Sequence, residues 1–234
     1  MILSIHQPSY FPWLGLLDKI RKSDVFMIMD EVQLSDSAYQ HRNLFLTADG
    51  KTKYLTIPFA KRDYLKKTFR EIEIAAPDWR KKHLNFIWNT YRNHPFASEV
   101  MPRVEVFFAG DYHFLADAVM TSMRLSLDLF GIETRVILQS ETDYDRSLRR
   151  GDLVLALARA AGAKCYISGT GAKAYLDEAA FSADISLRYN DFHHPSYLQK
   201  GVAGFHTGLA CLDALFNLGL DGARAMLLGN SNVR

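Results

Sequence analysis

Polar side chains that could do chemistry follow the first apolar segment of the chain. Residues 2–5 form a short apolar run typical of a buried strand, and His6 and Gln7 come directly after it. Ligands of open α/β sheets bind beyond the carboxyl ends of strands. An imidazole, an amide and a hydroxyl placed there can contact a phosphate or polarise a carbonyl. We therefore predict that His6 is catalytic and that Gln7 and Tyr10 bind substrate; the alternative is a turn that only caps the following helix.

Two aspartates beside apolar segments are candidate catalytic carboxylates. Asp30 follows the apolar run 25–29, which reads as a buried parallel strand. We favour it over the adjacent Glu31 because it comes directly after the buried run, and its carboxylate could bind a ribose hydroxyl, an amine or a magnesium ion. Asp213 lies in an apolar helical segment four residues before Asn217. There it is either a paired structural group or a catalytic residue.

Further substrate-binding candidates lie in two polar segments. Arg42 carries a planar guanidinium that matches a carboxylate or a phosphate, and Asn43 could orient a ligand amide. The alternative for this pair is a polar surface turn. Tyr197 and Gln199 could make polar contacts with the substrate. Three histidines near them fall within 14 residues, but two are adjacent and no known ligand spacing is completed, so no metal site is predicted.

A glycine-rich segment follows the apolar strand that ends near residue 167. Turns of this kind between a strand and a helix expose backbone N–H groups to an anion, and a lysine adds positive charge. The spacing differs from that of a P-loop, which has four residues between its glycines and then Gly-Lys-Ser/Thr. The segment is predicted to bind phosphate or nucleotide through Ser168, Gly169, Gly171, Lys173 and Tyr175.

The overall charge argues against a nucleic-acid partner. The chain of 234 residues carries 28 Lys and Arg against 26 Asp and Glu, a net charge of +2 with a pI near 8.4, which is too mild for a typical nucleic-acid binder. The basic residues between 61 and 70 are interpreted as a solvated loop, with a lid over phosphate as the alternative. This small net positive charge fits an enzyme with a local basic pocket for an anionic small molecule.

Composition places the chain among ordinary globular proteins, with 48% hydrophobic and 23% charged residues. No run approaches the roughly 20 apolar residues that a membrane span needs, and the N-terminus lacks the features of a signal peptide. Cys165 and Cys211 cannot make a disulfide framework, so we expect a cytoplasmic protein. Aromatic residues reach 12% and cluster beside polar groups, which suits a sugar or a base.

The fold must bring these polar segments together at strand ends. Apolar strands are predicted near residues 2–5, 25–29, 134–138, 165–167 and 185–189, and most alternate with helices. A hairpin is predicted over residues 38–58 because Asp49-Gly50 is a strong turn signal, with a further strand at 71–75. The alternation of strands and helices favours an α/β fold, with a mostly parallel sheet that is flanked by helices as in nucleotide-binding proteins. We predict one domain over 1–234, with a helical insertion at about 76–130.

The motifs together resemble the WbqC-like family over nearly the whole chain. The resemblance rests on Ile5-His6-Gln7-Pro8-x-Tyr10-Phe11-Pro12-Trp13-Leu14-Gly15, Asp18-Lys19-Ile20, Ser23-Asp24, Gln40-x-Arg42-Asn43, Tyr166-Ile167-Ser168-Gly169, Tyr175-Leu176-Asp177, Tyr197-x-Gln199, Phe205 and Leu212-Asp213-x-Leu215-Phe216-Asn217-x-Gly219. Tyr39 stands where the family commonly has Trp, and Ala210-Cys211 where it commonly has Ser and an aliphatic residue. A hydroxyl role at that Ser is therefore not carried over.

What the resemblance implies is an accessory enzyme of bacterial surface-polysaccharide (O-antigen) biosynthesis. Its expected reaction attaches an amino-acid or other acyl group to an amino sugar, and its expected partner is a sugar nucleotide. The opening strand, His loop and helix are also similar to pantothenate synthetase-like ligases, although the second His of their ATP loop is missing. By that analogy ATP and Mg would activate a carboxylate, His6 and Lys173 would stabilise phosphate charge, and Asp30 or Asp213 would bind magnesium or accept a proton.

Two other functions stay open at this point. A non-catalytic binding or scaffold protein for polysaccharide biosynthesis would need no convergent polar pocket. A tRNA-dependent aminoacyl transferase would need a larger basic face than a net charge of +2 indicates, although residues 61–70 could supply a local one. The sequence indicates no oligomeric state.

Overall fold

The structure, a computed structural model that describes residues 1–35 and 39–229, is built on a five-stranded parallel sheet. Its strands lie in the order β5-β2-β1-β6-β7, and each pairs with its neighbours in parallel. Numbered within the sheet, this order is 3-2-1-4-5, that of the doubly wound nucleotide-binding folds. The predicted α/β class is confirmed. The strands are β1 (Ile2–His6), β2 (Val25–Ile28), β5 (Arg135–Leu138), β6 (Cys165–Gly169) and β7 (Ser186–Asn190).

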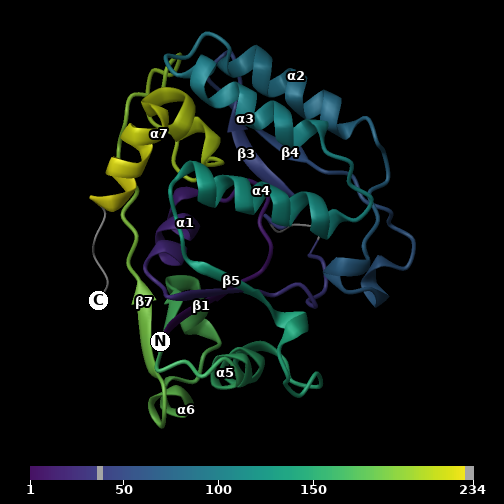
Figure 1. Ribbon diagram of the computed structural model, residues 1–234, viewed down its shortest axis with the longest axis vertical. Helices are drawn as coiled ribbons and strands as arrows, with labels where there is room; N and C mark the ends of the chain where they lie inside the picture. Colours follow the sequence, from purple (N-terminus) through teal and green to yellow (C-terminus); the bar gives the residue numbers. More distant parts are fainter. Residues whose placement is uncertain (36–38, 230–234) are drawn as a thin grey trace.

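Helices cover both faces of this sheet (Figure 1). In the view of Figure 1, α5 and α6 lie below the sheet, and the remaining helices lie above it. Successive residues of a strand point to opposite faces, and β2 shows this: Phe26 and Ile28 join the core with the upper helices, and Val25 and Met27 join the core with α5. The helices are α1 (Leu14–Arg21), α2 (Trp79–Tyr91), α3 (Ala97–Ala109), α4 (Leu115–Leu129), α5 (Arg150–Ala160), α6 (Glu178–Ser182) and α7 (Leu212–Leu228).

A separate two-stranded hairpin, β3 (Arg42–Leu46) with β4 (Thr52–Thr56), packs into the upper part of the molecule. The predicted turn at Gly50 is confirmed by its positive φ of 76°. The predicted strand at 71–75 is wrong. Its start belongs to a 3-10 turn, η2 (Phe69–Glu71), whose Glu71 side chain accepts hydrogen bonds from the Thr68 backbone and hydroxyl, and only isolated bridges follow.

Local contacts and backbone geometry set the limits of the last two helices. α6 begins at Glu178, because the Asp177 carboxylate caps the N–H groups of Ala179 and Ala180. Gly219, with φ 73° and ψ 176°, interrupts the helical backbone and divides α7 into two helical parts. Three further 3-10 turns are η1 (Tyr64–Lys66), η3 (Gln139–Glu141) and η4 (Thr170–Ala174). Within residues 1–35 and 39–229, no helix is both long and apolar enough to cross a bilayer.

The loop from β1 to α1 is held by hydrogen bonds from distant parts of the chain. The Asn43 side-chain amide donates to the carbonyl oxygens of Tyr10 at 3.0 Å and Phe11 at 2.7 Å. The Phe11 N–H donates to the Ser122 hydroxyl of α4 at 3.1 Å. Phe11 has φ 41°, a conformation that costs a non-glycine residue about 1–2 kcal/mol. These contacts stabilise that conformation and fix the direction in which α1 leaves the sheet.

We expect Asn43→Ala to lower the free energy of unfolding by about 2–4 kcal/mol, because it leaves two buried carbonyl groups without a donor. Chemical denaturation measures this effect. Asn89→Ala is the matched control, since Asn89 is exposed on α2, and its effect should stay within about 0.5 kcal/mol. Equal effects of the two substitutions would contradict the role of Asn43.

Candidate functional site

A cavity of about 1250 Å³ lies beyond the carboxyl ends of all five parallel strands. Each strand, or the short segment that follows it, contributes to the wall: His6 and Gln7 at β1, Glu31 after β2, Gln139 after β5, Ser168 and Gly169 at β6, and Asn190 at β7. The central pair β1 and β6 is the point where the strand order reverses, and doubly wound folds bind their ligands at such points. The cavity is therefore the candidate functional site.

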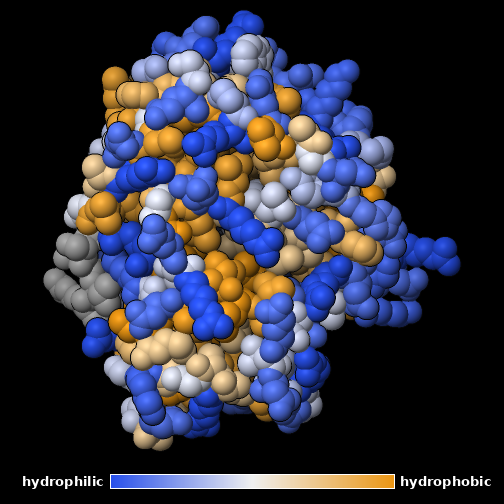
Figure 2. Space-filling model, in the orientation of Figure 1, coloured by the Kyte–Doolittle hydropathy of each residue, from blue (hydrophilic) through white to orange (hydrophobic). Residues whose placement is uncertain are grey.

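Positive charge dominates the cavity wall. Six lysine and arginine residues contribute to it against two carboxylates. The cations are Lys19, Lys66, Lys67, Arg146, Arg149 and Arg150, and the carboxylates are Glu31 and Asp191. An excess of cations in a concave site concentrates anionic ligands, so the wall fits an anion although the whole chain is nearly neutral. Figure 2 shows apolar side chains gathered in the centre of one face of the molecule, with hydrophilic side chains around them.

His6 faces the cavity as a neutral imidazole. Its Nδ1 lies 2.8 Å from the Gln7 carbonyl oxygen. Because a carbonyl only accepts, Nδ1 carries the hydrogen in this contact and Nε2 keeps its lone pair. Burial and the nearby Lys19 lower the pKa of His6 to about 3. The imidazole therefore offers an acceptor, rather than a positive charge, to a ligand at neutral pH.

Lys19 is the buried cation of the site. It lies on α1, is 5% exposed, and its Nζ donates to the Ile5 carbonyl oxygen at 2.9 Å. Burial lowers the pKa of Lys19 to about 7. Its amine therefore exchanges a proton near neutral pH, which is the range in which a general acid or base works.

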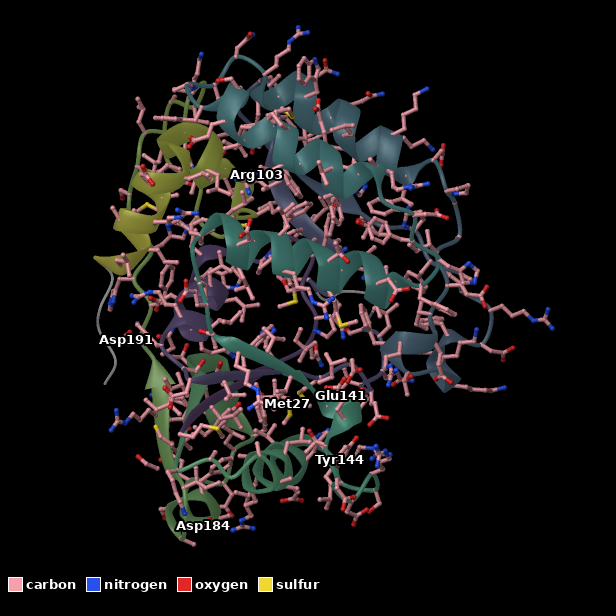
Figure 3. All side chains as sticks on the ribbon, in the orientation of Figure 1. Met27, Arg103, Glu141, Tyr144, Asp184 and Asp191 are labelled. Atoms are coloured by element: carbon pink, nitrogen blue, oxygen red, sulfur yellow. The ribbon has the colours of Figure 1, made fainter. Side chains whose placement is uncertain are left out.

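A hydrogen-bonded chain closes the cavity near the ends of β2 and β5. Gln139 donates to the Tyr144 hydroxyl at 2.7 Å, which in turn donates to the Glu31 carboxylate at 2.9 Å. Arg146 lies 3.3 Å from the same carboxylate and 4.9 Å from the centre of the Tyr144 ring. In Figure 3, Tyr144 lies beside α5, on the side of the view opposite Asp191 at the end of β7. The two residues mark different ends of the cavity.

The glycine-rich segment brings four of its five predicted residues to the cavity. Ser168, Gly169, Gly171 and Tyr175 line it. A side chain added at Gly169 or Gly171 would meet no protein atom within 4 Å, so the protein leaves this space open. Lys173 lies outside the cavity wall, with its ammonium 4.8 Å from the centre of the Tyr189 ring.

Asp30 lies behind the wall, and its neighbour Glu31 takes the cavity position. The Asp30 carboxylate is fully buried and accepts hydrogen bonds from the Ser140 N–H at 3.0 Å and the Ser140 hydroxyl at 2.7 Å. Arg70 lies 3.4 Å from it. These contacts join the ends of β2 and β5 through the Asp30 carboxylate.

Asp213, Tyr197 and Gln199 form a second polar cluster, away from the cavity wall. The Asp213 carboxylate accepts hydrogen bonds from Tyr197 at 2.7 Å, Gln199 at 3.2 Å and Tyr91 at 3.2 Å. Burial raises the pKa of Asp213. Gln199 also bonds both backbone groups of His206, so the cluster ties the segment after β7 to α7. Over residues 1–35 and 39–229, no group of three or more His, Cys, Asp or Glu is placed to hold a metal ion.

The remaining candidates support the loop and the hairpin. Tyr10 is fully buried, and its hydroxyl lies 3.0 Å from His83 Nδ1. Asn43 holds the β1–α1 loop, as described above. The Arg42 guanidinium lies 4.6 Å from the centre of the Tyr54 ring on the neighbouring strand. Of the residues predicted for catalysis and substrate binding, His6 and Gln7 line the cavity. The roles predicted for all of them stay predictions.

Sequence reasoning did not select most of the cavity's charged residues. Lys19 lies between Asp18 and Ile20 in a helix that also carries Arg21, so its burial, which is rare for a lysine, was visible only in the fold. The pair Arg149 and Arg150, at the start of a helix, was a weak signal. Glu31 carried no signal that separated it from Asp30, because the choice depends on Ser140, a residue 110 positions later.

Comparison with known proteins places this geometry in context. The WbqC-like protein family matches the chain over residues 7–225. This range includes every strand except β1 and every residue of the cavity wall except Ile5 and His6. Rv1507c, an uncharacterized protein of Mycobacterium tuberculosis, is 27% identical over 224 residues, which cover 94% of each chain. No solved structure matches the chain.

We predict that Lys19→Met stabilises the protein most below pH 7 and progressively less toward pH 10. The folded-state pKa of about 7 lies below the usual value of 10.5, so the unfolded chain binds more protons than the folded one between these two pH values. The resulting penalty is complete below pH 7 and disappears above 10.5, at about 1.4 kcal/mol per unit of pKa difference.

Denaturant unfolding of the parent protein and of Lys19→Met at pH 6, 8 and 10 measures the difference in their free energies of unfolding. Lys82→Met, at an exposed position of α2, is the control and should give a difference that is flat with pH. A flat difference for Lys19→Met as well would show that Lys19 is not buried as described.

Proposed function

The chain belongs to the WbqC-like protein family, and we propose that it binds a nucleotide-linked amino sugar in the cavity and attaches an amino-acid or other acyl group to it. The observation that carries this proposal is the cationic cavity at the point where the strand order reverses, beyond the ends of all five parallel strands. Cations suit the diphosphate of a sugar nucleotide. The proposed setting is bacterial surface-polysaccharide biosynthesis, as the family resemblance implies.

The acyl transfer forms a bond between the sugar nitrogen and the acyl carbon and breaks the bond from that carbon to its leaving group, which is the phosphate-bearing group of an ATP-activated carboxylate or the ribose oxygen of an aminoacyl-tRNA. The nitrogen loses a proton in the same reaction. In the proposed reaction Lys19, with a pKa of about 7, exchanges that proton near neutral pH. The lone pair of His6 Nε2 accepts a hydrogen bond from the amine and orients it. The open space at Gly169 and Gly171 admits the diphosphate beside backbone N–H groups. The acyl group comes either from a free carboxylate that ATP activates or from an aminoacyl-tRNA, and binding of ATP or of aminoacyl-tRNA distinguishes the two routes.

Isothermal titration calorimetry with ATP, UDP-linked sugars, dTDP-linked sugars and aminoacyl-tRNA tests the proposal. We expect at least one sugar nucleotide to bind in the range of about 1 μM to 1 mM that is usual for enzyme substrates. Binding of ATP in addition would favour a ligase, and binding of aminoacyl-tRNA a transferase. A protein that binds none of these compounds would instead fit a scaffold.

Gly169→Val should weaken binding without loss of stability. Gly169 has φ −76° and ψ 151°, a conformation that valine adopts readily, and a Cβ added there meets no other atom within 4 Å. We expect an affinity at least tenfold weaker, with an unfolding free energy within about 0.5 kcal/mol of the parent protein. Gly204→Val is the matched control, because Gly204 has equally open surroundings outside the cavity wall. Unchanged affinity in Gly169→Val would place the ligand elsewhere.

Arg150→Ala should weaken sugar-nucleotide binding about tenfold and make it less sensitive to salt. A charge-assisted hydrogen bond to phosphate contributes about 1.5–3 kcal/mol, and sodium chloride screens it. Titrations at 50 and 300 mM sodium chloride measure both effects. Arg103→Ala, on the exposed surface of α3, should change neither, and an equal loss in the two variants would argue against a specific contact.

A further inference from the structure

One end of the cavity differs from the rest in its chemistry. At the end of β7 the wall is formed by Asn190, Asp191 and Phe192, with Trp13 beside them. This end contributes a carboxylate, an amide and two aromatic rings. The cations of the wall come from α1, from the segment around η1 and from the connection between β5 and α5. A diphosphate is therefore drawn away from the β7 end.

The Trp13 ring is held in a fixed position there. It packs edge to face against Phe192, with ring centres 5.4 Å apart. It also lies against Gly15, where an added Cβ would come within 2.1 Å of the indole. The residue is 37% exposed, so part of the ring stays available to the cavity. A rigid, half-exposed aromatic surface gives up little conformational entropy when a ligand packs on it.

Asp191 supplies the polar group next to this ring. Its side chain is 42% exposed and lies 3.9 Å from His193. Asn190 is engaged in holding β7 to α1, since it accepts a hydrogen bond from Lys22 at 3.0 Å. A pyranose has an apolar C–H face and a rim of hydroxyl donors. The indole can bury that face, and the carboxylate can accept from the rim.

We propose that the Trp13–Asp191 end of the cavity is the glycosyl subsite, so that the bound sugar nucleotide lies with its sugar at β7 and its nucleoside toward β2 and β5. This inference rests on the proposed function and adds the orientation of the ligand. Glu31, at the end of β2, occupies the place where doubly wound folds present a carboxylate to ribose hydroxyls. The diphosphate then lies beside the glycine-rich segment, and the amine of the sugar faces His6.

Calorimetric titrations with UDP, dTDP, UDP-N-acetylglucosamine and dTDP-glucose test this orientation. We expect Trp13→Ala to weaken the binding of a sugar nucleotide about tenfold through lost apolar contact. Its affinity for the matching nucleoside diphosphate should stay within twofold. Trp88→Ala is the control, because Trp88 is an exposed tryptophan of α2 outside the cavity wall.

Gly15→Ala gives a second test that preserves the tryptophan. Alanine is the better helix former, so α1 should remain folded, and its Cβ displaces the Trp13 ring. We expect the same selective loss of sugar-nucleotide affinity. Equal losses of affinity for sugar nucleotides and for nucleoside diphosphates would show that Trp13 contacts the base. No loss of affinity in either variant would show that Trp13 does not contact the ligand. Each of these results overturns the proposed orientation and leaves the proposed function standing. If the parent protein binds none of the four compounds, the proposed function fails together with it.

Discussion

The Asn43 side chain, which holds two consecutive carbonyl groups of the β1–α1 loop, is the contact on which the rest of the architecture depends. Tyr10 and Phe11 receive its hydrogen bonds, and Phe11 keeps a left-handed backbone because of them and of Ser122. The loop is short, so its shape decides where the His6 side chain lies and where α1 begins. A residue on a peripheral hairpin thus sets the geometry at the centre of the sheet.

The polar residues of the molecule fall into two groups: buried ones that hydrogen-bond to the protein and ones that line the cavity. Tyr10 and Asn43 are buried and fully engaged with the protein, and Asp30 and Asp213 are likewise surrounded by donors. The cavity wall uses other groups, among them Glu31, Lys19 and the arginines before α5. Buried polar groups need partners, and here the partners come from distant elements. The supporting residues therefore make the cavity rigid, and the lining residues are left to meet a ligand.

The sequence predicted the sheet well because its strands are apolar runs whose signal is local. Val25–Ile28 and Cys165–Gly169 needed no knowledge of the rest of the chain. The site was harder, since the difference between a supporting and a lining residue depends on contacts across the fold. Asp30 and Glu31 are adjacent, and only Ser140 and Tyr144 assign them different places. Glu71 to Ala75 alternates like a strand, but only single bridges pair it with other segments.

The central strands of the sheet, β1 and β6, pair residues such as Leu3 and Tyr166 that are far apart in the chain. Contacts of this separation slow folding, because a long loop must close first. During synthesis at about 5–20 residues per second, the first strand waits for roughly 8–30 seconds before its partner emerges. During that interval β2 is the native partner of β1 that has already been made, and the other edge of β1 stays unpaired. A nascent chain of this protein is therefore open to chaperones, and to wrong strand partners, until most of it has been made.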